Sequence, residues 1–344
     1  MDWLLFGVFV VLMLSGVPLA VAMGLAGVAV VAVADLGMMS LPTNVYTGIA
    51  KYPLMAIPVF VIAGLIFEKA GVAASIVRFA SALVGQRRGS LAIVAILVAM
   101  ILGGISGSGP ADSAAVGAVM LPSMLKAGYP RPFVAGVIAA AGSTDILIPP
   151  SIAFVIYSLL VPQASVPALF AAGMIPGILS GLTLILVAWW LSVKNNFEAE
   201  PAEPRPPFWQ SLKEAGWGLL APVIILGGMR SGFFTPTEAA VVAVFYGLVV
   251  GMVIYRSLTW KDVYQVLVES AEISSVILTV VALASVFAWG SNTLGTFDHL
   301  AATLLGTGLS EIPMLLSIQL LLLIAGMFLD AISIYFIFQP LLIP

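Results

Sequence analysis

Gly104-Ile-Ser-Gly-Ser-Gly-Pro-Ala-Asp-Ser113 interrupts an apolar segment that runs from about residue 89 to residue 125. Basic residues flank this segment on both sides, at positions 87, 88, 126 and 131. Because basic residues prefer the cytoplasmic side of a membrane, both ends of the segment are expected on that side. The chain must then turn within the membrane, and glycine and proline suit such a turn. We therefore predict a re-entrant helical hairpin at about 89–126, with a single kinked helix as the alternative.

The composition of the whole chain also indicates a membrane protein. Of its 344 residues, 61% are hydrophobic and 8% are charged, whereas soluble domains carry about 25% charged residues. Apolar segments long enough to cross a bilayer, roughly 20 residues each, recur along most of the sequence, and the first continues too far for a signal peptide. The chain has no cysteine, and its net charge of −3 does not suit a basic nucleic-acid-binding surface. We predict an all-α, multi-pass protein of the lipid bilayer that binds no nucleic acid.

A polar, proline-rich stretch divides the chain into two halves that resemble each other. A shift of about 222 residues places Ile101-Leu-Gly-Gly104 on Leu323-Ile-Ala-Gly326 and Pro122 on Pro344. Such weak self-similarity is typical of transporter repeats, although apolar segments also match by chance. The counterpart of the hairpin, at 312–344, follows acidic residues instead of basic ones, which predicts entry from the opposite side. We therefore expect an inverted repeat with a first half at 1–193, a linker at 194–215 that carries an interfacial helix around 209–217, and a second half at 216–344.

Three polar breaks inside apolar segments are the candidate sites. They are 104–113; Gly142-Ser-Thr-Asp-Ile-Leu-Ile-Pro-Pro-Ser151, within a predicted broken helix at about 132–161; and Gly326-Met-Phe-Leu-Asp-Ala-Ile-Ser333. Unwound backbone is tolerated in a membrane only where protein or water surrounds it. Its free carbonyl oxygens suit Na⁺, and the N-termini of half-helices suit anionic groups. The breaks therefore indicate sites for a cation and for an anionic solute.

The carboxylates in these breaks have more than one interpretation. Asp145 is a candidate to bind a cation, to pair with a base, to take up a proton or to cap a helix. An ionisable group inside the membrane is costly, so it indicates function by default. Asp112 is expected to cap the helix that begins near Pro110. Asp330 is interpreted either as an ion ligand or as a cap, and a cap is expected for Glu238 as well.

Four motifs in order resemble the large membrane subunit of TRAP transporters, the DctM-like family. They are Gly-Ile-Ser-Gly-Ser-Gly-Pro-Ala at 104–111, Ile-Leu-Ile-Pro-Pro-Ser-Ile at 146–152, Phe-Thr-Pro-Thr-Glu-Ala-Ala at 234–240 and Gly-Met-Phe-Leu-Asp at 326–330. The resemblance covers essentially the whole chain. It implies an elevator-type transporter with a scaffold and a mobile domain, which works with a small four-helix membrane subunit and a periplasmic substrate-binding protein. It also implies Na⁺-driven uptake of a small organic anion across the inner membrane of a bacterium or archaeon, with no organic cofactor.

The resemblance further implies that the first two breaks together form one Na⁺ site. The candidate Na⁺ ligands are Ser106, Ser108, Gly142, Ser143 and Thr144, to which the carboxylates add Asp145 and Asp330. The candidates for substrate binding are Gly107, Gly109, Pro110, Ser113, Pro149, Pro150 and Ser151. A symmetry-related second site would combine 326–333 with a later Thr-Pro-Pro turn, which the sequence does not contain. We therefore predict a chain truncated at its C-terminus by on the order of 70–90 residues. Asp145 departs from the family, in which glycine is expected at this place.

Three alternative functions compete with the prediction of a TRAP transporter subunit. A stand-alone ion-coupled organic anion carrier of the same superfamily would share the breaks but need no binding protein. A channel would favour continuous pore-lining helices. An intramembrane enzyme would need a catalytic set, whereas the three aspartates lie in separate breaks with no histidine near them. We therefore predict a transport protein without enzymatic activity.

Overall fold

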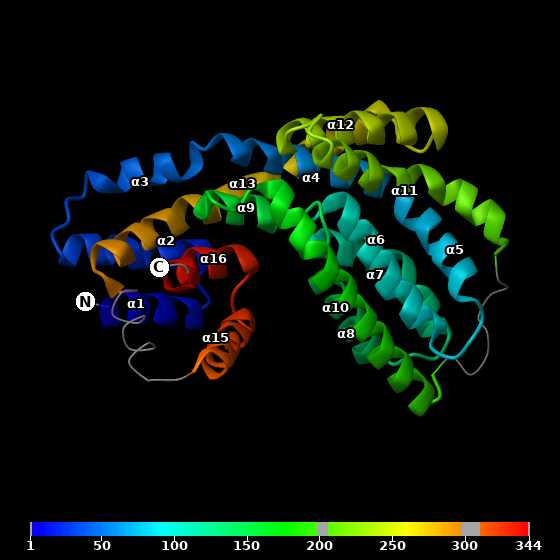
Figure 1. Ribbon diagram of the computed structural model, residues 1–344, viewed down its shortest axis with the longest axis horizontal. Coiled ribbons are helices and arrows are strands. Elements are labelled where there is room, and N and C mark those ends of the chain that lie inside the picture. The colour runs from blue at the N-terminus through cyan, green and yellow to red at the C-terminus, as the bar shows by residue number, and fades with distance from the viewer. Residues whose placement is uncertain (1, 198–205, 297–309, 343–344) are drawn as a thin grey trace. The chain divides into compact units, whose positions relative to one another are not determined.

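A computed structural model describes residues 2–197, 206–296 and 310–342. Every regular element in these ranges is a helix (Figure 1). Five helical stretches in them are long and apolar enough to cross a membrane: Tyr52–Lys69, Val166–Lys194, Phe208–Arg230, Pro236–Ile254 and Trp260–Thr293. The prediction of an all-α, multi-pass membrane protein is thereby confirmed.

The chain forms two compact units, and each unit draws on both halves of the sequence. Unit 1 comprises Met1–Leu54, Leu159–Pro162 and Ile273–Pro344, and unit 2 comprises Met55–Ser158 and Gln163–Glu272. The units therefore do not coincide with the expected halves 1–193 and 216–344. Helices pack with the neighbours that cover their apolar faces, and these neighbours need not be adjacent in sequence. The repeat relationship itself stays a prediction.

Unit 1 has a core in which glycine brings two helices close together. Its helices are α1 (Asp2–Leu14), α2 (Leu19–Val33), α3 (Ser40–Ile49), the second part of α13 (Trp260–Thr293), α15 (Glu311–Gly326) and α16 (Ala331–Leu342). A Cβ atom on Gly27 of α2 would lie 3.1 Å from the backbone nitrogen of Phe287 in α13. The Phe287 ring also meets the rings of Phe6 and Phe9, with centroids 5.9 and 5.6 Å away. The helices α1, α2 and α13 thus share one core.

Unit 2 is built around α6. Its helices are α4 (Ala56–Lys69), α5 (Val72–Val84), α6 (Ser90–Ser106), α7 (Gly109–Lys126), α8 (Arg131–Asp145), most of α9 (Ile152–Leu160), α10 (Val166–Lys194), α11 (Phe208–Arg230), α12 (Pro236–Leu248) with its π-helical extension η2 (Val249–Ile254), and the start of α13. The helix α6 packs against α4, α5, α7, α8 and α10. Ala92, Ala95 and Val98 of α6 have no exposed surface. A helix that is apolar all round suits either a protein core or lipid, and its packing against five helices places α6 in the core of unit 2. This placement fixes the end of α6 that carries the first polar break.

The helical hairpin and the broken helix of the expected fold class are present as α6–α7 and α8–α9. The short interfacial helix expected around 209–217 is not a separate element. These residues form the first part of α11, which continues to Arg230. Gly218 lets this helix approach α5, since a Cβ atom there would lie 2.5 Å from Val72 Cγ1. The polar and the apolar stretch thus form one helix that packs against α5.

The start of α12 confirms the capping role expected for Glu238. The Glu238 backbone N–H donates to Thr235 Oγ1 over 3.3 Å, and the Thr235 N–H donates to Glu238 Oε2 over 2.8 Å. This reciprocal pair is a capping box, which satisfies two backbone donors at the helix start.

Candidate functional site

The first polar break is the tight turn between α6 and α7. The helix α6 ends at Ser106, Gly107 has a left-handed conformation with φ of +64°, and Ser108 is extended. Glycine adopts positive φ without steric cost. The helix α7 then begins at Gly109, and Pro110 lies in its first turn, where a missing N–H costs no hydrogen bond. The residue types at 107–110 therefore account for a turn that reverses the chain within a few residues.

The second polar break separates α8 from α9. The helix α8 ends at Asp145, and α9 begins at Ile152. Between them the Leu147 N–H donates to the Thr144 carbonyl over 3.0 Å, and the peptide bond between Pro149 and Pro150 is cis. Proline cannot continue a helix because it lacks the N–H donor. Pro149, Pro150 and Ser151 are all buried, so this non-helical backbone lies inside the protein.

The two breaks lie directly against each other in unit 2. A Cβ atom on Gly107 would lie 2.2 Å from the Pro150 carbonyl oxygen, and one on Gly109 would lie 2.5 Å from the Gly142 carbonyl oxygen. A Cβ atom on Gly142 would in turn lie 1.8 Å from Ser113 Oγ. Real Cβ atoms do not approach other atoms this closely. A side chain at 107 or 109 would therefore have to displace backbone of the second break, whereas one at 142 would first displace the Ser113 hydroxyl. The structure thus brings together the candidate residues of 106–113 and those of 142–151.

Hydrogen bonds between side chains brace the hairpin turn. Ser106 Oγ donates to Asp112 Oδ2 over 2.6 Å and accepts from the Ser108 N–H over 3.1 Å. Both Ser106 and Asp112 are buried. Ser108, and not Asp112, occupies the N-cap position of α7, but Asp112 lies in the first turn and interacts with the Ser108 backbone, as expected of a residue that helps to cap the helix. The Asp112 carboxylate also holds the hydroxyl of Ser106, the residue that ends α6.

Asp145 is a fully buried carboxylate with one free oxygen. Its Oδ1 lies 3.5 Å from Thr144 Oγ1, whose single hydrogen is placed to donate to the Ala141 carbonyl over 2.7 Å. Its Oδ2 has no hydrogen-bond partner among the described residues. Asp112 is close enough for the charges of the two carboxylates to interact. Since a buried carboxylate oxygen without a partner is costly, this atom marks a position that suits a cation.

The other candidate residues differ in exposure and place. Ser108 and Ser113 are half-buried, whereas Pro110 and Ser143 are exposed, and Ser143 Oγ donates to the Ala140 carbonyl. Asp330 belongs to unit 1. There its Oδ2 accepts from the Ile332 N–H over 3.2 Å and its Oδ1 accepts from Ser333 Oγ. These bonds make Asp330 a cap at the start of α16.

Gly103 is a site residue that the sequence did not single out. A Cβ atom on Gly103 would lie 2.7 Å from both Cα and Cβ of Asp145. The absence of a side chain on α6 therefore makes the space that the Asp145 side chain occupies. The Gly103-Gly104 pair, noticed only for its match with the second half, was the available signal.

The oxygen atoms gathered at the two breaks suit a hard monovalent cation. They are backbone carbonyls, serine and threonine hydroxyls and carboxylates, which are the ligand types of Na⁺ sites in transporters. Within the described ranges, no group of three or more His, Cys, Asp or Glu side chains is placed to hold a metal ion. The oxygen atoms of the two breaks thus suit a carbonyl-rich cation site.

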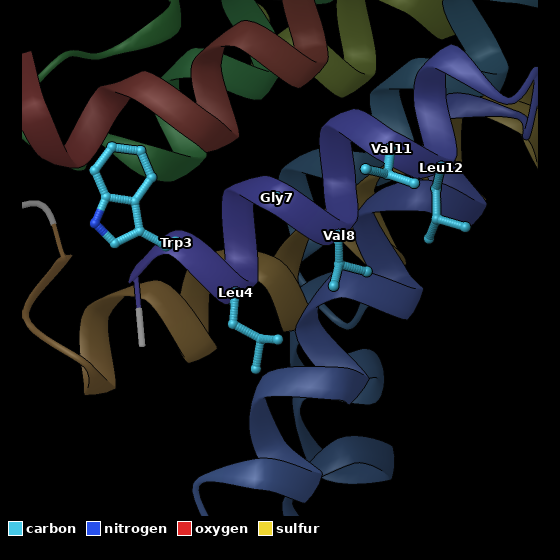
Figure 2. A pocket seen from close by; sticks show the side chains of 6 residues that line it. All are labelled: Trp3, Leu4, Gly7, Val8, Val11 and Leu12. Carbon is cyan, nitrogen blue, oxygen red and sulfur yellow. The ribbon is translucent and has the colours of Figure 1, made fainter.

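A depression on α1 in unit 1 has the opposite character. It has a volume of about 360 Å³ and is lined by Trp3, Leu4, Gly7, Val8, Val11 and Leu12, which all lie along one helix (Figure 2). Its lining offers apolar side chains and no charged group, so it does not suit an anionic solute.

Comparison with known proteins identifies the family. Residues 6–344 match the family described as the tripartite ATP-independent periplasmic transporter, DctM component. The chain is 37% identical over 342 residues to an isethionate TRAP transporter permease protein DctMQ from Oleidesulfovibrio alaskensis, covering 99% of this chain and 54% of that protein. It is 34% identical over 355 residues to the C4-dicarboxylate TRAP transporter large permease protein DctM of Rhodobacter capsulatus, covering 99% and 81%. It is 39% identical over 332 residues to the 2,3-diketo-L-gulonate TRAP transporter large permease protein YiaN of Escherichia coli, covering 96% and 77%.

The chain thus spans about half the length of the first of these relatives and about four fifths of the other two. The relatives are permease proteins of transporters and not enzymes. Together with the helical breaks in a multi-pass membrane fold, these matches show that the chain belongs to the DctM family, the DctM component of tripartite ATP-independent periplasmic (TRAP) transporters.

Proposed function

We propose that this chain is the subunit that moves a small organic anion through the membrane together with Na⁺. The observation that carries the proposal is the contact between two polar breaks, the second of which also carries Asp145, a buried carboxylate with one oxygen that has no partner among the described residues. Irregular backbone at membrane depth in a transporter lines the substrate and ion sites. A site made from two separate segments also responds to ligand, because an ion that binds oxygens from both segments stabilises their contact.

The Na⁺ ion would bind oxygens from both breaks. Ser106 Oγ donates to Asp112 and accepts from Ser108, so it keeps one lone pair for a cation. The Gly142 carbonyl points toward Gly109, and Asp145 Oδ2 has no other described partner. Ser108, Ser143 and Thr144 would contribute from the same two segments. A second ion position near Asp330 follows from the repeat symmetry alone, and there the carboxylate also caps α16.

The organic anion would bind at the helix starts beside the ion. The helix α7 begins at Gly109 and α9 at Ile152, and helix N-termini favour negative charge. Gly107, Gly109, Pro110, Pro149 and Pro150 lie at or just before these helix starts, and Ser113 and Ser151 supply hydroxyls. The three relatives are named for isethionate, C4-dicarboxylate and 2,3-diketo-L-gulonate. These names support a small organic acid as the solute of this chain.

The assembly proposed for the chain follows its family. A small four-helix membrane subunit and a periplasmic substrate-binding protein would complete the transporter in the bacterial or archaeal inner membrane. The relative named DctMQ is longer than this chain, which supports a second membrane component. Transport would proceed by an elevator motion, in which Na⁺ orders the hairpin turn before the loaded domain moves.

The experiment is solute uptake into proteoliposomes that contain the full-length chain, its small subunit and its binding protein. Uptake is measured with and without an inward Na⁺ gradient, and with and without the binding protein. We expect uptake to require both. Uptake that needs the gradient but not the binding protein would support a stand-alone carrier, and uptake indifferent to Na⁺ would contradict the ion site.

Variants then locate the ion site. Ser108→Ala and Asp145→Asn are expected to raise the Na⁺ concentration needed for half-maximal uptake. Thr183→Ala is the matched control for a lost hydroxyl, since Thr183 is exposed on α10 and bonds only to the Ser180 carbonyl of its own helix. Unchanged Na⁺ dependence in both site variants would refute the assignment.

A further inference from the structure

One end of unit 2 carries a cluster of exposed cations, which we call the basic end. It consists of Arg87, Arg88, Lys126, Arg131 and Lys194. These residues come from three separate places: the α5–α6 connection, the last turn of α10, and the end of α7 with the start of α8. They are far apart in sequence, so their assembly on one end is a property of the fold.

Contacts between the backbones and side chains hold the first two places together. A Cβ atom on Gly89 would lie 3.2 Å from Ser192 Cβ and 3.2 Å from Trp189 Cδ1, so the start of α6 lies against the end of α10. Arg88 Nη1 donates to Asn196 Oδ1 over 2.8 Å. The guanidinium of Arg88 is therefore held beside the end of α10, where Lys194 lies.

Aromatic rings join the third place to the same end. The Phe197 ring meets the rings of Tyr129 and Phe133, with centroids 5.5 and 5.2 Å away. Tyr129 and Phe133 themselves stack at 5.8 Å. The α7–α8 connection and the start of α8, where Arg131 lies, therefore pack on Phe197, three residues after the end of α10. All three basic segments are neighbours.

The cations of the basic end have no carboxylate partner within the described part of the chain. The ion pairs found there are Lys69 with Glu269 and Arg78 with Glu214, and neither involves this end. Lys194 Nζ instead lies 4.9 Å above the ring of Trp190, a cation–π contact that leaves the charge free to bind an anion. Among the described residues, the cluster is thus an oriented positive surface without a carboxylate partner.

An exposed apolar face begins directly beside these cations. On α10, Leu182, Leu186, Trp189 and Trp190 are all more than 40% exposed. Tryptophan at the end of an exposed apolar helix marks the level of the lipid headgroups. The cations at this level and the apolar surface below it match the two parts of a phospholipid, a negatively charged headgroup and its acyl chains.

We propose that the basic end binds the headgroups of anionic phospholipids in the cytoplasmic leaflet. The general preference of basic residues for the cytoplasm requires positive charge in the connecting loops, but it does not require three loops to be packed into one surface beside exposed tryptophans. A free phosphate or another soluble anion would use the cations but not the apolar face. This binding is independent of the solute and of the coupling ion.

The test measures lipid binding to the full-length purified transporter by native mass spectrometry, with phosphatidylglycerol or phosphatidylcholine added. The wild type is expected to bind phosphatidylglycerol in preference. The triple variant Arg87→Gln, Arg88→Gln, Lys194→Gln is expected to lose at least about tenfold in apparent affinity for it. The matched control, Lys51→Gln, Arg230→Gln, Lys261→Gln, removes three exposed cations outside the basic end and is expected to bind as the wild type does.

Two further measurements keep the proposal open to refutation. If the triple variant does not fold, the wild type alone is titrated with NaCl, which should remove the preference by screening the headgroup contacts. Millimolar inorganic phosphate is added in a separate arm and should displace little lipid. An equal affinity for both lipids, a salt-independent preference, a variant that binds like its control, or displacement by phosphate alone would overturn the proposal.

Discussion

Replacing Gly107 with alanine tests the contact between the two breaks most directly. The left-handed backbone at this residue, with φ of +64°, disfavours any side chain, and a Cβ atom would also lie 2.2 Å from the Pro150 carbonyl oxygen. Gly128 is a matched control in the same unit. It has φ of +85°, and no atom lies within 4 Å of the position of its Cβ atom. Both substitutions impose backbone strain, but only one forces the breaks apart.

The expected losses of stability follow from the backbone strain and from the steric overlap. An alanine in the left-handed region costs roughly 1–2 kcal/mol, and this cost applies to both variants. At Gly107 the overlap with backbone atoms of the second break is relieved only if the segments separate by about 1 Å, and overpacking of this kind costs about 1–3 kcal/mol more. The buried Pro150 carbonyl belongs to a segment fixed on both sides by helices, so the neighbour cannot yield as a flexible side chain would.

The assay is thermal unfolding of the purified protein, followed by Na⁺-driven uptake in proteoliposomes. Gly107→Ala is expected to unfold a few degrees below Gly128→Ala and to lose uptake, while Gly128→Ala keeps it. If the two variants unfold at the same temperature and both transport like the wild type, the breaks are not in close contact, and the proposed ion site loses its geometric basis.

Three other substitutions test separate contacts. Asp112→Ala removes the acceptor for the buried Ser106 hydroxyl and should cost about 1–3 kcal/mol of unfolding free energy. The control Asp112→Asn keeps an acceptor oxygen and should cost less. Equal losses in the two variants would show that this hydrogen bond is unimportant. The Cβ atom of Gly27→Ala would meet the backbone of α13, so this variant is expected to lose about 1–3 kcal/mol of unfolding free energy. In the control Gly181→Ala, the nearest atoms belong to the side chain of a methionine, and its melting temperature should be close to that of the wild type. A lower melting temperature for Gly181→Ala than for Gly27→Ala would refute the packing argument. Glu269→Gln breaks the 2.7 Å ion pair with Lys69, in which the Glu269 side chain is 45% and the Lys69 side chain 24% exposed. The substitution should cost under about 1 kcal/mol of unfolding free energy, and this cost should disappear in high salt. A larger loss that does not depend on salt would mean that the pair is effectively buried.

Local sequence signals were sufficient for the fold class and for the position of the breaks. Low charge and long apolar segments require a bilayer, because a soluble chain could not cover itself. Glycine at 107 and 109, proline at 110 and the Pro149-Pro150 pair each stop a helix by their own backbone chemistry. Such signals act within a few residues, so they are readable without knowledge of the rest of the molecule. The same motifs also indicated the family to which the chain belongs.

Only the tertiary structure decided which of these residues meet. Asp112 was expected to cap its own helix, and the structure adds that its carboxylate accepts a hydrogen bond from Ser106 across the turn. The space for Asp145 is made by Gly103 on a neighbouring helix, and the polar stretch around 209–217 joins α11 because it packs on α5. The two compact units likewise take segments from both halves of the chain. Composition and local motifs determine where helices begin and end, whereas the partner of a buried side chain depends on which helix faces come together, and many sequences with the same local signals allow different pairings.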